Sequence, residues 1–185
     1  MKKIIALLII LLPAITYNGD LAAQDRKLRL VFIRHAEKPA DGDNLDCRGL
    51  NRSMLLPTVL YKKFGNASGI YVPSLKSGKS SGRARMLQTI TPYAVKYNLN
   101  INSKYAEEDD EGVAQALFRE TGTVIIVWEH HAILPVLKAL GVKKTKTMVW
   151  NDSDFDSILI VTFADGKAIL TKDQEGLRPA DGCLF

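Results

Sequence analysis

The sequence contains three histidines, and all of them lie beside charged side chains at the end of an apolar stretch. His35 follows Arg34 directly after "LRLVFI", while Glu129, His130 and His131 directly follow "TVIIVW". An imidazole can act as a nucleophile, a general base or a metal ligand, and a guanidinium beside it binds anions. Histidines at the ends of two buried strands therefore predict a functional site, and the arginine favours an anionic substrate.

A further arginine segment, "SGRARMLQT", opens a helix over residues 81–89. Free N–H groups and the helix dipole favour anions at such a position, and the guanidinium of Arg85 matches phosphate oxygens in bidentate fashion. Arg83 is interpreted as a solvated side chain. The adjacent "SGKS" resembles a nucleotide-binding P-loop, but Pro73 occupies the position of that motif's first glycine, which excludes nucleoside triphosphate binding.

The scaffold for these residues follows from apolar spacing along the chain. Strands are predicted over residues 28–33, 69–72, 99–102 and 123–128, and helices over 50–64, 84–97, 111–119 and 133–140. "FDSILIVTF" and "KAILTK" flank "ADG", which predicts a C-terminal hairpin. This order predicts an α/β fold, a three-layer α/β/α sandwich with a mostly parallel sheet and an antiparallel C-terminal edge hairpin. In such sheets, ligands bind beyond the carboxyl ends of the strands, where all three histidines fall.

The N-terminal segment has the order of a secretory signal peptide, with a charged start, an apolar run over residues 4–15 and a pair of alanines ending at Ala23. The run is shorter than the about 20 residues that span a bilayer. We expect residues 1–23 to be a signal peptide and residues 24–185 to form one domain that is periplasmic or secreted. An uncleaved signal anchor is the alternative, and it is the only membrane association expected.

Without residues 1–23, which contain Lys2, Lys3 and Asp20, the 25 basic and 20 acidic residues become 23 and 19, a net charge of +4. This mild excess suits an anionic ligand and does not predict nucleic-acid binding.

Cys47 and Cys183 are the only cysteines. In an exported protein we expect them to form a disulfide, with two free thiols as the alternative.

Three motifs in this order resemble the histidine phosphatase superfamily, which has the phosphoglycerate mutase-like fold. They are "RHAEK" after a strand, "RMLQT" at a helix start and "IIVWEHHAI" at a later strand, and the resemblance covers most of residues 28–170. Ala36 replaces the usual glycine of Arg-His-Gly, and His131 stands where glycine or asparagine often follows the second histidine. Both departures indicate a divergent branch, and neither changes a side chain that touches phosphate.

The resemblance implies phosphoryl transfer without a metal or cofactor. His35 would be the nucleophile, and Arg34 and Arg85 would hold the equatorial oxygens of the phosphoryl group. His130, when protonated, would bind the same oxygens. His131 is interpreted as a side chain at a helix start.

A leaving alcohol needs a proton, which the superfamily often takes from an acidic residue. The acidic run "YAEEDDEG", residues 105–112, offers several carboxyls. Glu108 is the predicted proton donor, with Asp109 as the alternative. Glu37 and Lys38 are expected to pair with each other or to line the entrance of the site.

The function expected from these residues is an exported phosphatase that hydrolyses a phosphomonoester through a phosphohistidine. Its substrate would be a phosphorylated small molecule or an envelope glycan. The alternatives are a non-catalytic phospholigand-binding module on the same fold and a phosphohistidine protein phosphatase.

A metal-dependent hydrolase is ranked last, because the adjacent His130 and His131 are expected to point apart and to lack a third ligand. The acidic segment "WNDSDFDS", residues 150–157, is interpreted as a polar turn. The oligomeric state is left open.

Overall fold

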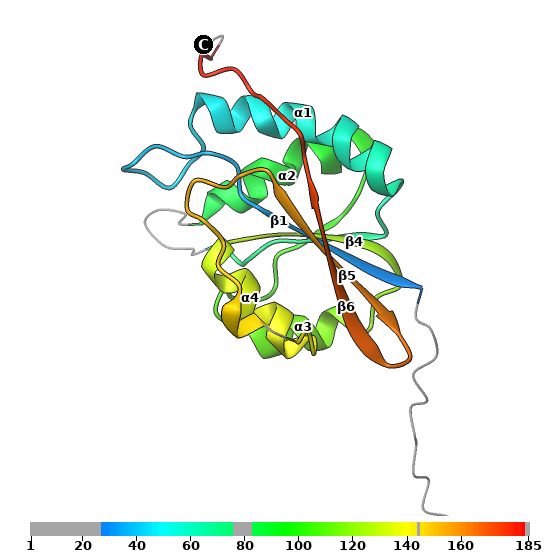
Figure 1. The fold of residues 1–185 in the computed structure, drawn as a ribbon. Helices are drawn as coiled ribbons and strands as arrows, with labels where there is room; N and C mark the ends of the chain where they lie inside the picture. The colour runs from blue at the N-terminus through cyan, green and yellow to red at the C-terminus, as the bar shows by residue number, and fades with distance from the viewer. Residues whose placement is uncertain (1–26, 76–82, 144, 184–185) are drawn as a thin grey trace, which may run out of the picture.

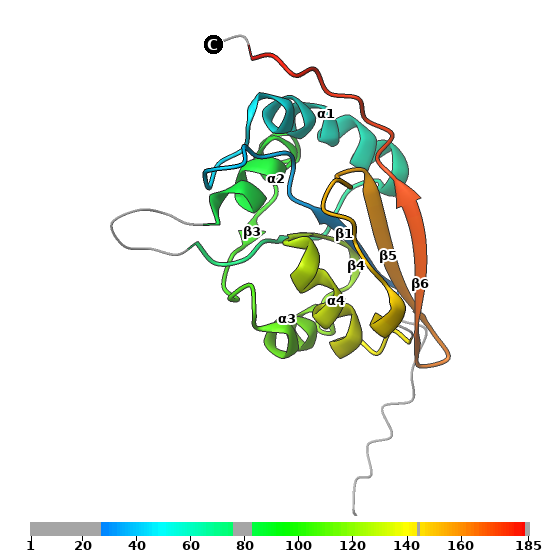
Figure 2. The ribbon, with the colours of Figure 1, turned by 60° about the vertical axis from the view of Figure 1, so that its left-hand side comes forward.

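The structure is a computed structural model that describes residues 27–75, 83–143 and 145–183, with only the backbone of Lys146. A mixed sheet of six strands lies between two pairs of helices, as Figures 1 and 2 show. The strands are β1 (Leu28–Arg34), β2 (Gly69–Tyr71), β3 (Ile101–Asn102), β4 (Gly122–Trp128), β5 (Ser157–Ala164) and β6 (Lys167–Gln174). The helices are α1 (Cys47–Phe64), α2 (Ala84–Tyr97), α3 (Asp110–Leu117) and α4 (His130–Ala139), with a 3₁₀ turn at Thr145–Thr147.

The sheet has the order β3-β2-β4-β1-β5-β6, in which β3, β2, β4 and β1 are parallel and β5 and β6 are antiparallel to them. The helices α1 and α2 cover one face, and α3 and α4 cover the other (Figure 2). The predicted three-layer α/β/α sandwich with an antiparallel C-terminal hairpin is therefore confirmed.

The two central strands are buried on both faces, which explains their uninterrupted apolar sequences. Successive side chains of a strand point to opposite faces. In β1, Leu30 and Phe32 accordingly join the core under α3 and α4, whereas Val31 and Ile33 join the core under α1 and α2. Because β1 and β4 pair in parallel with Arg34 opposite Trp128, the residues that follow both strands meet at one edge of the sheet.

Two helices begin three residues earlier than their apolar spacing predicts, and in both cases an acidic residue caps the N-terminus. The helix α1 begins at Cys47, where the side chain of Asp46 accepts a hydrogen bond from Gly49 N at 2.8 Å. The helix α4 begins at His130 because Glu129 caps it. Periodicity alone missed these first turns, since capping residues are polar and lie outside the apolar pattern.

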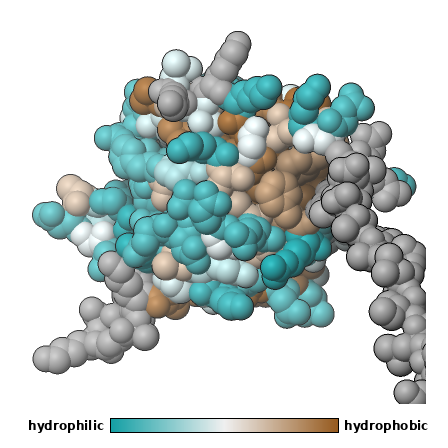
Figure 3. All heavy atoms as spheres, turned by 90° about the horizontal axis from the view of Figure 1, so that it is seen from below, coloured by the Kyte–Doolittle hydropathy of each residue, from teal (hydrophilic) through white to brown (hydrophobic). Residues whose placement is uncertain are grey.

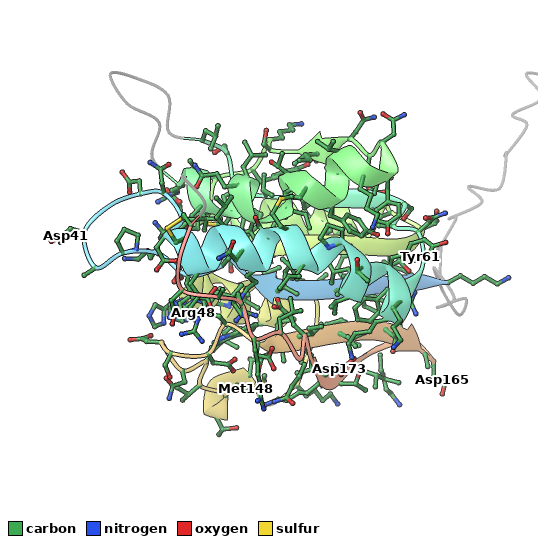
Figure 4. All side chains as sticks on the ribbon, turned by 90° about the horizontal axis from the view of Figure 1, so that it is seen from above. Asp41, Arg48, Tyr61, Met148, Asp165 and Asp173 are labelled. Atoms are coloured by element: carbon green, nitrogen blue, oxygen red, sulfur yellow. A yellow bond between two sulfur atoms is a disulfide. The ribbon has the colours of Figure 1, made fainter. Side chains whose placement is uncertain are left out.

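The predicted disulfide between Cys47 and Cys183 is confirmed. The C-terminal segment runs back across α1 (Figures 1 and 4), and the Asn51 amide donates hydrogen bonds to Ala180 O and Gly182 O at 2.8 and 2.9 Å. The disulfide therefore ties the C-terminal segment to the first turn of α1.

We expect replacement of both Cys47 and Cys183 by serine to lower the free energy of unfolding by about 2–5 kcal/mol, because the cross-link restricts the unfolded chain. The bridge joins residues 136 positions apart, so it constrains most of the domain. Urea denaturation of the two forms measures the difference. Equal midpoints and slopes would contradict the expectation.

The described helices include none that is long and apolar enough to cross a membrane. The predicted signal peptide over residues 1–23 and the "SGKS" segment lie outside the described residues.

Candidate active site

His35 lies at the carboxyl end of β1 and is only 1% exposed. Its Nδ1 lies 2.7 Å from Ala36 O, so the proton on Nδ1 is donated to that carbonyl and Nε2 keeps its lone pair. Burial lowers the pKa of His35 to about 3, against the opposing effect of the Ala36 bond, and the charges of Arg85 and Arg34 add to the lowering. The ring is therefore neutral at physiological pH, with Nε2 available as a nucleophile.

The Arg-x-x-Gln-Thr spacing of α2 has a structural reason. Thr89 Oγ1 accepts a hydrogen bond from Ala36 N at 2.9 Å and donates one to Arg85 O at 2.7 Å. Gln88 Oε1 accepts from Leu45 N at 3.1 Å. Residues three and four apart share one face of a helix, so these side chains join the first turn of α2 to the segment after His35.

The guanidinium of Arg34 is held from two sides. Its Nη1 donates to Asp152 O at 2.6 Å, and its central carbon lies 4.0 Å from the centre of the Phe155 ring. The Nε–H groups of Arg34 and Arg85 are both buried and have no hydrogen-bond partner among the described residues. Buried donors without acceptors are costly, so these groups suit an anion that brings several acceptor oxygens.

His130 lies between two carboxylates. Its Nε2 is 2.7 Å from Asp152 Oδ1, and its Nδ1 is 2.5 Å from Glu129 Oε1, although the second contact is poorly aligned for a hydrogen bond. Burial lowers the pKa of His130, while the bond to Asp152 opposes that change. One ring nitrogen each of His35 and His130 and a carboxylate oxygen of Glu129 lie within 4.8 Å of one another. The structure thus brings His35 and His130 together, as predicted.

Solved structures of other proteins have the same fold. The protein histidine phosphatase SixA in complex with tungstate superposes with a TM-score of 0.59 at 16% identity, over 80% of this chain and 97% of that one. This chain has the fold of the histidine phosphatase superfamily. The mycobacterial glucosyl-3-phosphoglycerate phosphatase Rv2419c, in complex with inorganic phosphate, gives a TM-score of 0.55 at 13% identity over 78% of this chain and 95% of that one.

A phosphoserine phosphatase from Entamoeba histolytica, solved with 3-phosphoglyceric acid, gives a TM-score of 0.54 at 15% identity over 82% of this chain and 98% of that one. No protein-family model matches the sequence, and no curated protein matches it significantly. The likeness is therefore one of histidine phosphatase fold.

Within the acidic segment, the carboxyl that is buried and senses the charges of Glu129 and Arg85 is that of Glu107, the neighbour of the predicted donor Glu108. The Glu108 side chain is 69% exposed and contacts Arg83 at 2.7 Å, whereas the Glu107 side chain is 18% exposed. Burial raises the pKa of Glu107, to which the charge of Glu129 adds, while Arg83 and Arg85 oppose the rise. A buried carboxyl with a raised pKa is better suited to donate a proton.

The alternative donor, Asp109, caps α3 by accepting a hydrogen bond from Gly112 N at 3.0 Å. The interpretation of Arg83 as a solvated side chain is wrong, because it contacts both Glu107 and Glu108 and is 19% exposed. Trp128 Nε1 donates to Glu107 O at 3.0 Å and so fixes the backbone of the acidic segment against the end of β4.

Glu129 and Phe155 were not among the predicted site residues. Glu129 Oε2 accepts hydrogen bonds from His131 N at 2.6 Å and Ala132 N at 3.2 Å, so one carboxylate both caps α4 and faces His130. The sequence feature that could have identified Glu129 is its position between a buried strand and a helix. Phe155 comes from the 150–157 segment, and its place beside His35 and Arg34 depends on folding.

The expectation that His130 and His131 point apart and lack a third ligand is wrong. Their ring centres are 3.9 Å apart, and Asp152 Oδ1 lies 2.7 Å from His130 Nε2 and 3.5 Å from His131 Nε2. The segment over residues 150–157, interpreted as a polar turn, therefore contributes Asp152 to the histidine pair and three backbone oxygens to Arg34.

Glu37 and Lys38 neither pair nor behave alike. Glu37 is buried and forms a two-pronged ion pair with Arg52, at 2.8 Å for each bond. Lys38 Nζ donates to Pro39 O at 3.1 Å. Glu37 therefore holds the segment after His35 against α1, and it also lines a cavity of about 320 Å³ together with Phe155.

A separate groove of about 670 Å³ lies at the opposite end of the sheet from His35, between the end of α4 and the β5–β6 hairpin. Apolar side chains gather on this lower side of the molecule (Figure 3). Its lining includes Phe118, Met148 and Phe163. The groove contains none of the predicted site residues.

The lowered pKa of His35 predicts a pH dependence of stability. The pKa falls from an ordinary value of 6.5 to about 3 on folding, so between these values the unfolded chain binds the proton that the folded chain does not. The neutral, buried ring of His35 therefore contributes its full share to the free energy of unfolding above pH 6.5. That share is lost as the pH falls toward 3, because the unfolded chain gains a proton that the folded chain does not. We expect His35→Asn to lose less stability than the wild type between these limits in urea denaturation. Parallel pH profiles for the two proteins would contradict this.

Proposed function

We propose that the protein is an exported phosphatase that hydrolyses a phosphomonoester without a metal, through a phosphohistidine at His35. The observation that carries this proposal is the state of His35. Its ring is oriented by Ala36, its pKa is lowered to about 3 by burial with a contribution from Arg85 and Arg34, and these arginines have buried Nε–H donors that lack partners among the described residues. Such an arrangement combines an unprotonated nucleophile with positive charge for the phosphoryl oxygens.

The reaction has two steps. His35 Nε2 attacks phosphorus, the N–P bond forms and the ester P–O bond breaks, while the leaving oxygen takes a proton from Glu107. Water then attacks phosphorus, its proton passes to the Glu107 carboxylate, and the N–P bond breaks to release phosphate. The Nε–H groups of Arg34 and Arg85 stabilise the charge on the phosphoryl oxygens in both steps.

The proposed substrate is a phosphorylated small molecule or an envelope glycan outside the cytoplasm. The disulfide between Cys47 and Cys183 supports export, because structural disulfides persist in oxidising compartments. The fold shared with a glucosyl-3-phosphoglycerate phosphatase supports a phosphorylated carbohydrate as one class to include.

The test is hydrolysis of an aryl phosphate by the purified protein with a chelator present. We expect turnover, inhibition by vanadate, and a trapped phosphoenzyme that is lost in acid and survives base. An acid-stable adduct would exclude the His35 route. Activity that vanishes with the chelator and returns with zinc would favour metal-dependent hydrolysis. Tight phosphate binding without turnover of any phosphomonoester would favour a binding module.

A second candidate, a phosphohistidine protein phosphatase, is favoured by the fold shared with SixA, at a TM-score of 0.59. A protein carrying phosphohistidine should therefore be included among the substrates tested. Faster release of phosphate from that protein than from any small phosphomonoester would favour this candidate.

A further inference from the structure

Two imidazoles and a carboxylate converge on the outer side of His130. The Nε2 atoms of His130 and His131 are 2.7 and 3.5 Å from the same oxygen, Asp152 Oδ1. One ligand atom from each residue lies within 4.8 Å of the others. We propose that these three residues bind a divalent transition-metal ion such as Zn²⁺, in addition to the phosphatase chemistry and not as part of it.

The distances suit this class of ion. Zn²⁺ binds histidine nitrogen and carboxylate oxygen at about 2.0–2.2 Å, so neighbouring ligand atoms of a tetrahedral site lie about 3.3–3.5 Å apart. The contact between His131 and Asp152 already has this length, and the one between His130 and Asp152 would open by less than about 1 Å. The side chains of His131 and Asp152 are 72% and 80% exposed, which gives an ion access and leaves room for water as the fourth ligand.

A second observation supports a metal site on His130. Metal-bound histidines usually donate their other ring N–H to a carboxylate, which fixes the tautomer. Glu129 Oε1 lies 2.5 Å from His130 Nδ1, on the side of the ring away from Asp152, and a small rotation would align this contact. Because the side chain of His130 is only 7% exposed, it would act as a fixed ligand.

The Asp152 ligand is also positioned in advance. Its backbone oxygen accepts from Arg34 Nη1 at 2.6 Å, and Trp150 Nε1 donates to Asp154 O at 2.9 Å across the same turn. Ligand positions held by other contacts reduce the conformational cost of binding an ion.

A second group of possible ligands, His35, Glu129 and His130, lies on the inner side. A cation at either group would feel the charge of Arg34, which lowers the pKa of both His35 and His130, but at the inner group it would also face Arg85, whose charge lowers the pKa of His35. Like charges repel most strongly where water is excluded. The outer group, which contains the exposed Asp152, is therefore the favoured site.

The experiment is calorimetric titration of the full protein with Zn²⁺ in a phosphate-free buffer, together with Co²⁺, whose visible absorption reports its coordination. We expect one ion per chain and an absorption spectrum typical of imidazole ligands. His131→Ala should weaken Zn²⁺ binding by about 10-fold or more, because it removes a direct ligand. Asp152→Ala is the second variant, and His35→Ala is the matched control on the inner side, which should bind Zn²⁺ as the wild type does.

Absence of binding, or equal affinity in His131→Ala and the wild type, would overturn the proposal. Loss of binding in His35→Ala with retention in His131→Ala would assign the ion to the inner group and would also overturn it. No substrate is present in these titrations. A lack of Zn²⁺ binding in these titrations is therefore distinguishable from a lack of the proposed phosphatase activity.

Discussion

Replacing His35 by alanine should reduce hydrolysis of an aryl phosphate on the order of 10⁴-fold or more, because the group that forms the covalent intermediate is removed. The remaining side chains would still bind phosphate, since Arg34 and Arg85 keep their buried donors. We therefore expect phosphate affinity to change less than turnover. Rapid-quench labelling should detect phosphoenzyme in the wild type and none in His35→Ala.

Two controls separate chemistry from folding in this experiment. The thermal midpoint of His35→Ala shows whether the variant is folded. Lys38→Ala changes a charge three residues away, whose ammonium donates to the backbone oxygens of Pro39 and Ala40, so it should keep wild-type turnover. Phosphoenzyme in His35→Ala would assign the nucleophile to another residue and contradict the proposed function.

Replacing Arg52 by methionine should lower the free energy of unfolding at neutral pH by about 3–5 kcal/mol, because it leaves the buried Glu37 carboxylate without its closest cation and Glu175 without its hydrogen-bond donor. Arg52 is 4% exposed and lies between Glu37, at 2.8 Å, and Glu175, at 2.5 Å. Burial raises the pKa of Glu175 to about 8, whereas Arg52 helps to hold the pKa of Glu37 below its ordinary value, so the charge left behind at neutral pH is mainly that of Glu37. The loss should be smaller near pH 5, where the Glu37 carboxylate of the variant can take up a proton.

The matched control is Lys63→Ala, which breaks an ion pair with Asp173 at 2.9 Å whose side chains are 30% and 38% exposed. Exposed pairs of this kind contribute about 0–1 kcal/mol, so this variant should unfold close to the wild type. Urea denaturation at both pH values measures the two variants. Similar losses for Arg52→Met and Lys63→Ala would contradict a stabilising role for the buried network.

Local sequence patterns determined the main elements and the central part of the site. The apolar stretches before Arg34 and Glu129 identify the two buried strands, and parallel pairing places His35 and His130 at one edge. The spacing of Arg85, Gln88 and Thr89 likewise follows from one helix face. These features depend on residues a few positions apart, for which strand and helix geometry sets the direction of each side chain.

The tertiary structure decided which polar neighbours matter. Glu107 and Glu108 are adjacent in sequence, yet one side chain is 18% and the other 69% exposed, because Trp128 holds the backbone of the acidic segment. Asp152 reaches His130 from 22 residues away, and Glu175 reaches Arg52 from 123 residues away. Burial and ion pairing depend on contacts between distant segments, and local periodicity does not determine those contacts.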